Sequence, residues 1–126
     1  MTNSKKIEWI LRIGIAGEFL GHGLLAIGGK ADWLKWISQL TKVDAATAVS
    51  LLMLVGVVDV IVALVVLFKP LGPKVLRPVL IYAAIWGFWT ALVRPLVGAG
   101  WLDFIERFAN WSAPLALFYM LKDENK

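Results

Sequence analysis

The chain has 126 residues, of which 60% are hydrophobic and 17% are charged, and it carries a net charge of +4. This composition excludes a water-soluble globular protein and predicts one small all-α domain in a lipid bilayer, over residues 1–126. The absence of cysteine excludes disulfides and thiol redox chemistry, and the single histidine excludes a bis-histidine haem within one chain. The basic residues lie beside apolar segments, so they indicate membrane topology and no binding of nucleic acid.

The first apolar stretch, residues 7–27, is long enough to cross a membrane, because about 20 helical residues span the bilayer core. It places Glu18 near the midplane and His22 one turn later on the same helix face. A carboxylate at that depth costs about 3 kcal/mol or more, which predicts a partner from another helix. Three glycines beside this face predict close contact with a neighbouring helix: Gly14, Gly17 and Gly21.

The next two segments predict an interfacial helix and a second crossing. Residues 32–41 place Trp33, Trp36, Ile37 and Leu40 on one face of an amphipathic helix. We expect this helix to anchor the chain at the membrane interface, with a lid over one membrane face as the alternative. The second crossing, residues 45–68, follows the capping residue Asp44, and its one charged residue, Asp59, lies at about the depth of Glu18.

Two further crossings complete the predicted fold. Residues 78–97 carry an aromatic stripe that includes Trp86 and Trp89, and they place Arg94 near the end of the helix. Residues 101–121 carry polar side chains along one side of a fourth helix: Asp103, Glu106, Arg107 and Asn110. The pattern therefore predicts an integral membrane four-helix bundle with a short interfacial helix between the first two crossings.

The basic residues predict the topology of this bundle. Four crossings place seven cations on the side of the two termini: Lys5, Lys6, Lys69, Lys74, Arg77, Lys122 and Lys126. Three cations lie on the opposite side: Lys30, Lys35 and Lys42. Because short cytoplasmic loops of membrane proteins are enriched in lysine and arginine, we expect both termini in the cytoplasm.

Depth estimates bring polar groups from four helices into one zone of the membrane, which we take as the candidate ligand-binding site. Its predicted members are Glu18, His22, Asp59, Trp86, Trp89, Arg94, Glu106, Arg107 and Asn110. In one interpretation this zone is a cavity for a small molecule, a quinone headgroup or a proton, since ionisable residues inside membranes usually mark functional sites. The tryptophans would then stack on a flat ring while His22 or Arg94 bonds to its oxygen.

Two other interpretations of the same zone stay open. Arg94 and Arg107 can pair with Glu106, Glu18 or Asp59 and serve only to set the register of the helices. A metal site formed by Glu18, His22 and Glu106 is conceivable, but we expect none.

Two segments resemble a known family. The stretch LRIGIAGEFLGHGLLAIGGK combines an arginine, a glycine-rich helix, a histidine-glycine pair and a lysine just beyond, and LVGVVDVIVALVVLF follows in the second crossing. Both resemble the first two helices of the DoxX and DoxX-like family of small four-helix membrane proteins, with Asp59 where a glutamate is common. The resemblance implies that Arg12, Glu18, His22 and Asp59 are the family's polar positions.

The family includes membrane subunits associated with thiosulfate:quinone oxidoreduction and with thiol or oxidative-stress systems. The resemblance therefore implies a subunit in the bacterial inner membrane that binds a quinone, has an oxidoreductase as its partner and forms homo-oligomers in some cases. The sequence contains no covalent cofactor site or electron carrier, so we expect an accessory role. A structural or assembly protein without a ligand and a small proton-coupled transporter are the alternatives.

Overall fold

The computed structural model describes residues 1–124, and this part of the chain is helical without strands. The helices are α1 (Asn3–Ile27), α2 (Ala31–Thr41), α3 (Ala45–Phe68), α4 (Pro73–Leu96), α5 (Trp101–Ile105) and α6 (Ala109–Glu124). The all-α prediction is confirmed. Three of these helices, α1, α3 and α4, are long and apolar enough to cross a membrane, which is consistent with a membrane protein.

The residue at which each helix begins is set by its N-terminal cap. For α1 and α4, the first helical residue differs from the prediction. α3 begins at Ala45 as predicted, because the Asp44 side chain accepts a hydrogen bond from the Thr47 amide at 3.0 Å. α1 begins earlier than residue 7, since the Thr2 hydroxyl accepts from the amide of Lys5 at 3.2 Å. α4 begins at Pro73, earlier than the predicted residue 78, because a proline in the first helical position loses no hydrogen bond.

The prediction of one continuous helix over residues 101–121 is wrong. Residues 106–108 form turns between α5 and α6, and the amide of Asn110 bonds to the Arg107 carbonyl three residues back, at 2.9 Å. The guanidinium of Arg107 donates to the carbonyl of Asp103 at 3.0 Å, which satisfies the end of α5. The break directly precedes the turn in which Pro114 offers no amide to the Asn110 carbonyl. A fourth crossing would therefore need α5 and α6 together, and the four-helix bundle stays a prediction.

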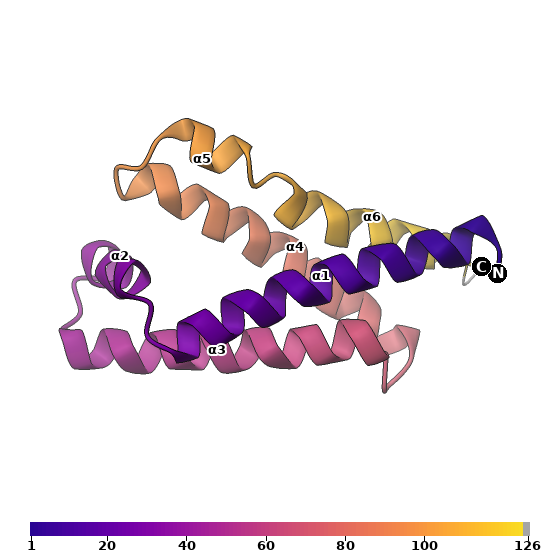
Figure 1. Ribbon diagram of the computed structural model, residues 1–126, viewed down its shortest axis with the longest axis horizontal. Coiled ribbons are helices and arrows are strands. Elements are labelled where there is room, and N and C mark those ends of the chain that lie inside the picture. The colour runs from indigo at the N-terminus through magenta and orange to yellow at the C-terminus, as the bar shows by residue number, and fades with distance from the viewer. Residues whose placement is uncertain (125–126) are drawn as a thin grey trace.

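The helices form two antiparallel pairs (Figure 1). α1 packs along α3, whereas α4 packs along α5 and α6. The pairs meet where α1 contacts α6, at the end of the molecule where both termini lie, and they diverge toward the opposite end. There α2 runs across the direction of the long helices and packs on α3. Of the cations assigned to the terminal side, Lys126 lies outside the described residues.

The buried core lies where the two pairs meet. Its largest members come from all four long segments: Ile15, Phe19, Val66, Leu76, Leu80 and Leu117. The prediction that Gly17 and Gly21 contact a neighbouring helix is wrong, since a Cβ atom added at either position meets nothing within 4 Å. The close approach instead joins Gly23 to Gly56, where a Cβ on Gly56 would lie 2.7 Å from the Gly23 carbonyl oxygen.

Arg12 fastens α1 to the end of α3. Its Nε donates to the carbonyl of Val66 at 2.8 Å, and a second nitrogen donates to the carbonyl of Leu67. The third nitrogen donates to the buried carboxylate of Glu8 at 3.2 Å. These carbonyls belong to the last turn of α3 and have no partners within their own helix. Each of the three guanidinium nitrogens of Arg12, one of the family-like polar positions, is therefore hydrogen-bonded within the fold.

Candidate functional site

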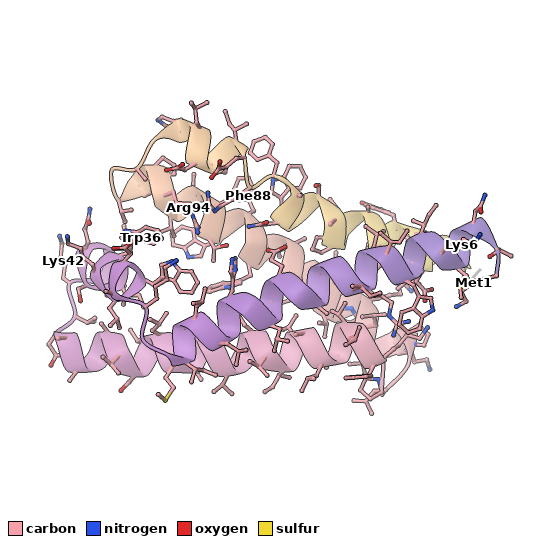
Figure 2. The ribbon with its side chains drawn as sticks, in the orientation of Figure 1. Met1, Lys6, Trp36, Lys42, Phe88 and Arg94 are labelled. Carbon is pink, nitrogen blue, oxygen red and sulfur yellow. The ribbon has the colours of Figure 1, made fainter. Side chains whose placement is uncertain are left out.

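A cavity of about 190 Å³ lies at the end of the molecule where the helix pairs diverge. It is enclosed by α2 together with parts of α1, α3 and α4, and Figure 2 shows Trp36 of α2 and Arg94 of α4 facing each other there. Its lining residues are His22, Trp33, Trp36, Ile37, Leu40, Thr41, Leu52, Val55, Asp59, Trp86, Trp89, Thr90, Val93 and Arg94. The walls are thus mostly apolar and aromatic, with few polar groups.

The volume limits what can enter this cavity. An apolar cavity of about 150 Å³ is large enough to hold benzene, whereas pockets for drug-sized molecules measure about 300–1,000 Å³. The cavity between α2 and α4 therefore matches a single ring with small substituents.

Five of the predicted site residues come together in this cavity. His22 lies on α1, Asp59 on α3, and Trp86, Trp89 and Arg94 on α4. Their side chains meet because the spacing of Trp86, Trp89 and Arg94 keeps them near one side of α4, opposite α2. Five of the nine predicted site residues therefore come from three different helices and line one cavity.

Glu18 lies next to the cavity and does not line it. It precedes His22 by one turn of α1, is half-buried, and is close enough to Asp59 for the two charges to interact. The sequence-based prediction that Glu18 forms the centre of the site stays a prediction, while its neighbour His22 lines the cavity.

Three predicted site residues lie elsewhere. Glu106 and Arg107 are neighbours in the turn after α5, where they form an ion pair with the Glu106 side chain 61% exposed. The backbone carbonyl of Asn110 packs directly on Gly87 of α4, so this residue serves the contact between α4 and α6. None of these three residues lines the cavity, and the depth estimate that grouped them with it assumed one continuous helix where residues 106–108 form turns.

The interpretation of the polar zone as interhelical ion pairs is also not supported. Among the side chains of residues 1–122, Arg94 forms no salt bridge with a carboxylate, and Arg107 pairs only with the adjacent Glu106. Arg94 is 7% exposed, donates one hydrogen bond to the carbonyl of Thr90, and lies 5.3 Å from the centre of the Trp36 ring. The buried guanidinium of Arg94 thus lines the cavity and has further N–H donors available beyond its bond to Thr90.

Sequence reasoning missed the contribution of α2 to the site. Trp33 meets the His22 ring edge-to-face at 5.5 Å, and Trp36 lies against Arg94. Both tryptophans line the cavity, so α2 covers the site as in the lid alternative. The signal available in the sequence was the pair of tryptophans on one face of a short helix, but the same pattern is typical of a simple interfacial anchor.

The two charged groups of the cavity lie at different depths. Asp59 is 14 positions into α3, about 21 Å from the α2 end at the standard helical rise, whereas Arg94 lies only about 3 Å before the end of α4. Asp59 is 4% exposed, and its Oδ1 atom has no hydrogen-bond partner among the side chains and backbone of residues 1–122. The cavity therefore has an acidic inner end and a basic outer end.

In the described part of the chain, no three histidine or acidic side chains gather closely enough to hold a metal ion. Of the three residues considered for a metal site, Glu18 and His22 lie on α1, whereas Glu106 lies on the exposed turn after α5. Comparison of the chain with models of known protein families, with curated proteins and with solved structures gave no match. The likeness to DoxX proteins thus stays a resemblance in two helices, and the function must be argued from the site itself.

Proposed function

We propose that this protein binds one small ring compound, with a quinone headgroup as the best fit, in the cavity beneath α2. The observation that carries the proposal is Arg94, a buried arginine without a carboxylate partner that faces a 190 Å³ cavity lined by four tryptophans. No carboxylate of residues 1–122 lies within salt-bridge distance of Arg94, although the charges of Asp103 and Glu106 act on it. A ligand oxygen in the cavity would accept from the N–H donors that Arg94 leaves free.

The chemistry of the walls matches a quinone. Tryptophan faces stack on flat rings, and Arg94 and His22 supply the N–H donors that a quinone oxygen needs. The outer surface of α3 is apolar, including Leu54, Val57 and Ile61, so a molecule dissolved in the lipid can approach the helices that line the cavity. The cavity thus combines hydrogen-bond donors, from Arg94 and His22, with walls formed largely by tryptophan rings.

The same proposal includes the biological setting. The protein is a DoxX-like subunit of a bacterial inner membrane, with α5 and α6 together as its fourth crossing and both termini in the cytoplasm. The cavity then opens toward the outer face. An oxidoreductase partner supplies the electron transfer, because this chain has no redox cofactor or cysteine of its own. Labelling of Lys74 from the outer face of intact cells would contradict this orientation.

Quenching of tryptophan fluorescence tests the binding directly. The protein in lipid nanodiscs is titrated with ubiquinone-1, and we expect saturable quenching because four indoles surround the ligand. Arg94→Met should weaken binding about tenfold or more, since a charge-assisted hydrogen bond is lost. Lys6→Gln is the control, because it removes a charge from the exposed start of α1, at the end of the molecule opposite Arg94 (Figure 2), and should leave binding unchanged. Absence of saturable binding to the unchanged protein would refute the proposal.

A proton-coupled transporter is the second candidate, and one observation favours it: Asp59 is buried beside the cavity with the charge of Glu18 nearby. Proton release upon addition of a substrate, in protein free of quinone, would support this function. A stoichiometric protein partner that co-purifies while the cavity stays empty would instead support a structural or assembly role.

A further inference from the structure

We infer that a second pocket, between the start of α4 and the end of α6, binds the headgroup of an anionic phospholipid. This inference goes beyond the proposed function, because it concerns the other end of the molecule and a different kind of ligand. The pocket measures about 310 Å³ and is lined by Lys74, Arg77 and Pro78 of α4 and by Phe118 of α6. α4 begins on the side of the molecule where both termini lie (Figure 1). The pocket therefore lies toward the membrane boundary on that side.

The pocket carries two cations that no acid neutralises within residues 1–122. Lys5 and Arg12, at the same end of the molecule, share the carboxylate of Glu8 at 3.6 and 3.2 Å. No side chain of residues 1–122 forms a salt bridge with Lys74 or Arg77. A ligand with a negative charge would therefore complement this pocket.

Arg77 has donors for such a ligand. Its Nε atom is buried without a partner among residues 1–122 and is closed to the pocket. Its two terminal nitrogens also donate no hydrogen bond to that part of the chain, and they are not closed off in the same way. Arg77 can thus donate from these two nitrogens to oxygens in the pocket.

Phe118 holds the guanidinium of Arg77 in place without using these donors. The central carbon of the guanidinium lies 5.2 Å from the centre of the Phe118 ring, which is within the range of a cation–π contact. A planar guanidinium matches two oxygens of one phosphate group, whereas a lysine ammonium acts as a point charge. Lys74 precedes Arg77 by three residues, so both lie near one side of α4. The pair therefore fits a phosphate group.

An exposed apolar face of α4 continues from the pocket toward the middle of the membrane. Tyr82 and Ile85 follow Pro78 at spacings of four and three residues, which keeps them on one side of the helix, and they are 39% and 66% exposed. At the standard rise, Ile85 lies about 16 Å from Lys74, close to the roughly 15 Å of one leaflet. A lipid acyl chain can use this face, whereas free phosphate would use only the pocket, so the continuity favours a lipid.

The charge of the pocket also distinguishes between lipids. Phosphatidylglycerol carries a phosphate without a compensating cation. Phosphatidylcholine carries a quaternary ammonium beside its phosphate, and Lys74 and Arg77 repel that ammonium. We therefore expect the anionic lipid to be preferred, although both lipids have phosphate oxygens that accept hydrogen bonds.

Native mass spectrometry tests this inference. The protein is released from nanodiscs that contain equal amounts of phosphatidylglycerol and phosphatidylcholine with the same acyl chains and no quinone. We expect a bound phosphatidylglycerol molecule, retained with about tenfold preference over phosphatidylcholine, and Arg77→Gln should lower this preference below about threefold. Lys6→Gln is the matched control, because it removes one charge at the same end of the molecule from an exposed residue that does not line the pocket (Figure 2). It should keep the full preference.

Lys74→Gln, at an exposed position, replaces Arg77→Gln if that variant does not fold. Equal retention of the two lipids by the unchanged protein would overturn the inference. An equal fall of the preference in Arg77→Gln and Lys6→Gln would overturn it as well, because the preference would then reflect the charge of the whole surface. Displacement of the lipid by inorganic phosphate, added before release, would assign the pocket to a free anion and refute the lipid.

Discussion

Two buried arginines distinguish the two ends of this molecule. Arg12 is 4% exposed and Arg94 is 7% exposed, so both lie inside the fold. Arg12 bonds to two carbonyls of α3 and to Glu8, whereas Arg94 bonds to a single carbonyl of its own helix. The end that carries the termini is closed by such contacts, and the end covered by α2 contains a cavity.

The buried carboxylates show the same contrast. Glu8 is 1% exposed and has both Arg12 and Lys5 as cationic partners. Asp59 is 4% exposed, and no side chain of residues 1–122 forms a salt bridge with it. A buried charge with partners in the fold stabilises the fold, and a buried charge without them is held at a cost to stability, which is typical of a functional site. Four substitutions test this comparison.

Arg12→Met should have the largest effect on stability. It leaves the carboxylate of Glu8 buried without its arginine and frees the last carbonyls of α3, so we expect a loss of about 3–5 kcal/mol in the free energy of unfolding. Unfolding in mixed detergent micelles, followed by circular dichroism, measures it. A loss below about 1 kcal/mol would show that the terminal end does not depend on this residue.

Gly56→Ala should come next, with an expected loss of about 1–3 kcal/mol. Its new Cβ would lie 2.7 Å from the carbonyl oxygen of Gly23, and overpacking against the backbone forces α1 and α3 apart. Gly17→Ala is the control on the open face of α1, where the added methyl group meets nothing within 4 Å. The melting temperature of Gly56→Ala should therefore fall, and that of Gly17→Ala should stay close to the wild-type value. An equal decrease in both variants would contradict the packing of α1 on α3.

Arg94→Met repeats the first substitution at the open end and should change stability by less than about 1 kcal/mol. The lost interactions are one hydrogen bond and one cation–π contact, and polar contacts between membrane helices contribute only about 0.6 kcal/mol on average. The same variant should lose ligand binding in the fluorescence titration. A loss of stability as large as that of Arg12→Met would mean that Arg94 is a structural residue.

Asp44→Ala should have the smallest effect, and that effect should depend on pH. Hydrogen bonds from Thr47 lower the pKa of this exposed carboxyl below its ordinary value. Because the folded-state pKa is lowered, the cap stabilises α3 above the ordinary aspartate pKa of about 3.9, and this contribution disappears as the pH falls through the lowered value. Melting temperatures of the two proteins should differ at pH 7 and converge at low pH. A constant difference would assign the effect to helix propensity.

The sequence by itself determined the elements whose signals lie within a single helix. Residues 45–68 form α3 as predicted, because Asp44 caps a long and mostly apolar run. The amphipathic pattern of residues 32–41 matches α2, and the glycines after Ile27 end α1. Asp59 and Arg94 could be singled out as ionisable groups in apolar surroundings, because such groups are rare there.

The tertiary structure alone decided which face each helix turns inward. On α1, the inward face carries Arg12, Phe19 and Gly23, and not the face with Gly17 and Gly21. Sequence periodicity does not reveal this choice, because lipid and protein interior are equally apolar and exposed positions such as Ile13 and Leu24 look like core residues. The break before α6 and the seating of α2 over the cavity also arise from contacts between helices. For that reason the sequence indicated the charged residues of the site, but only the packing of α2, α3 and α4 determined which of them share a cavity.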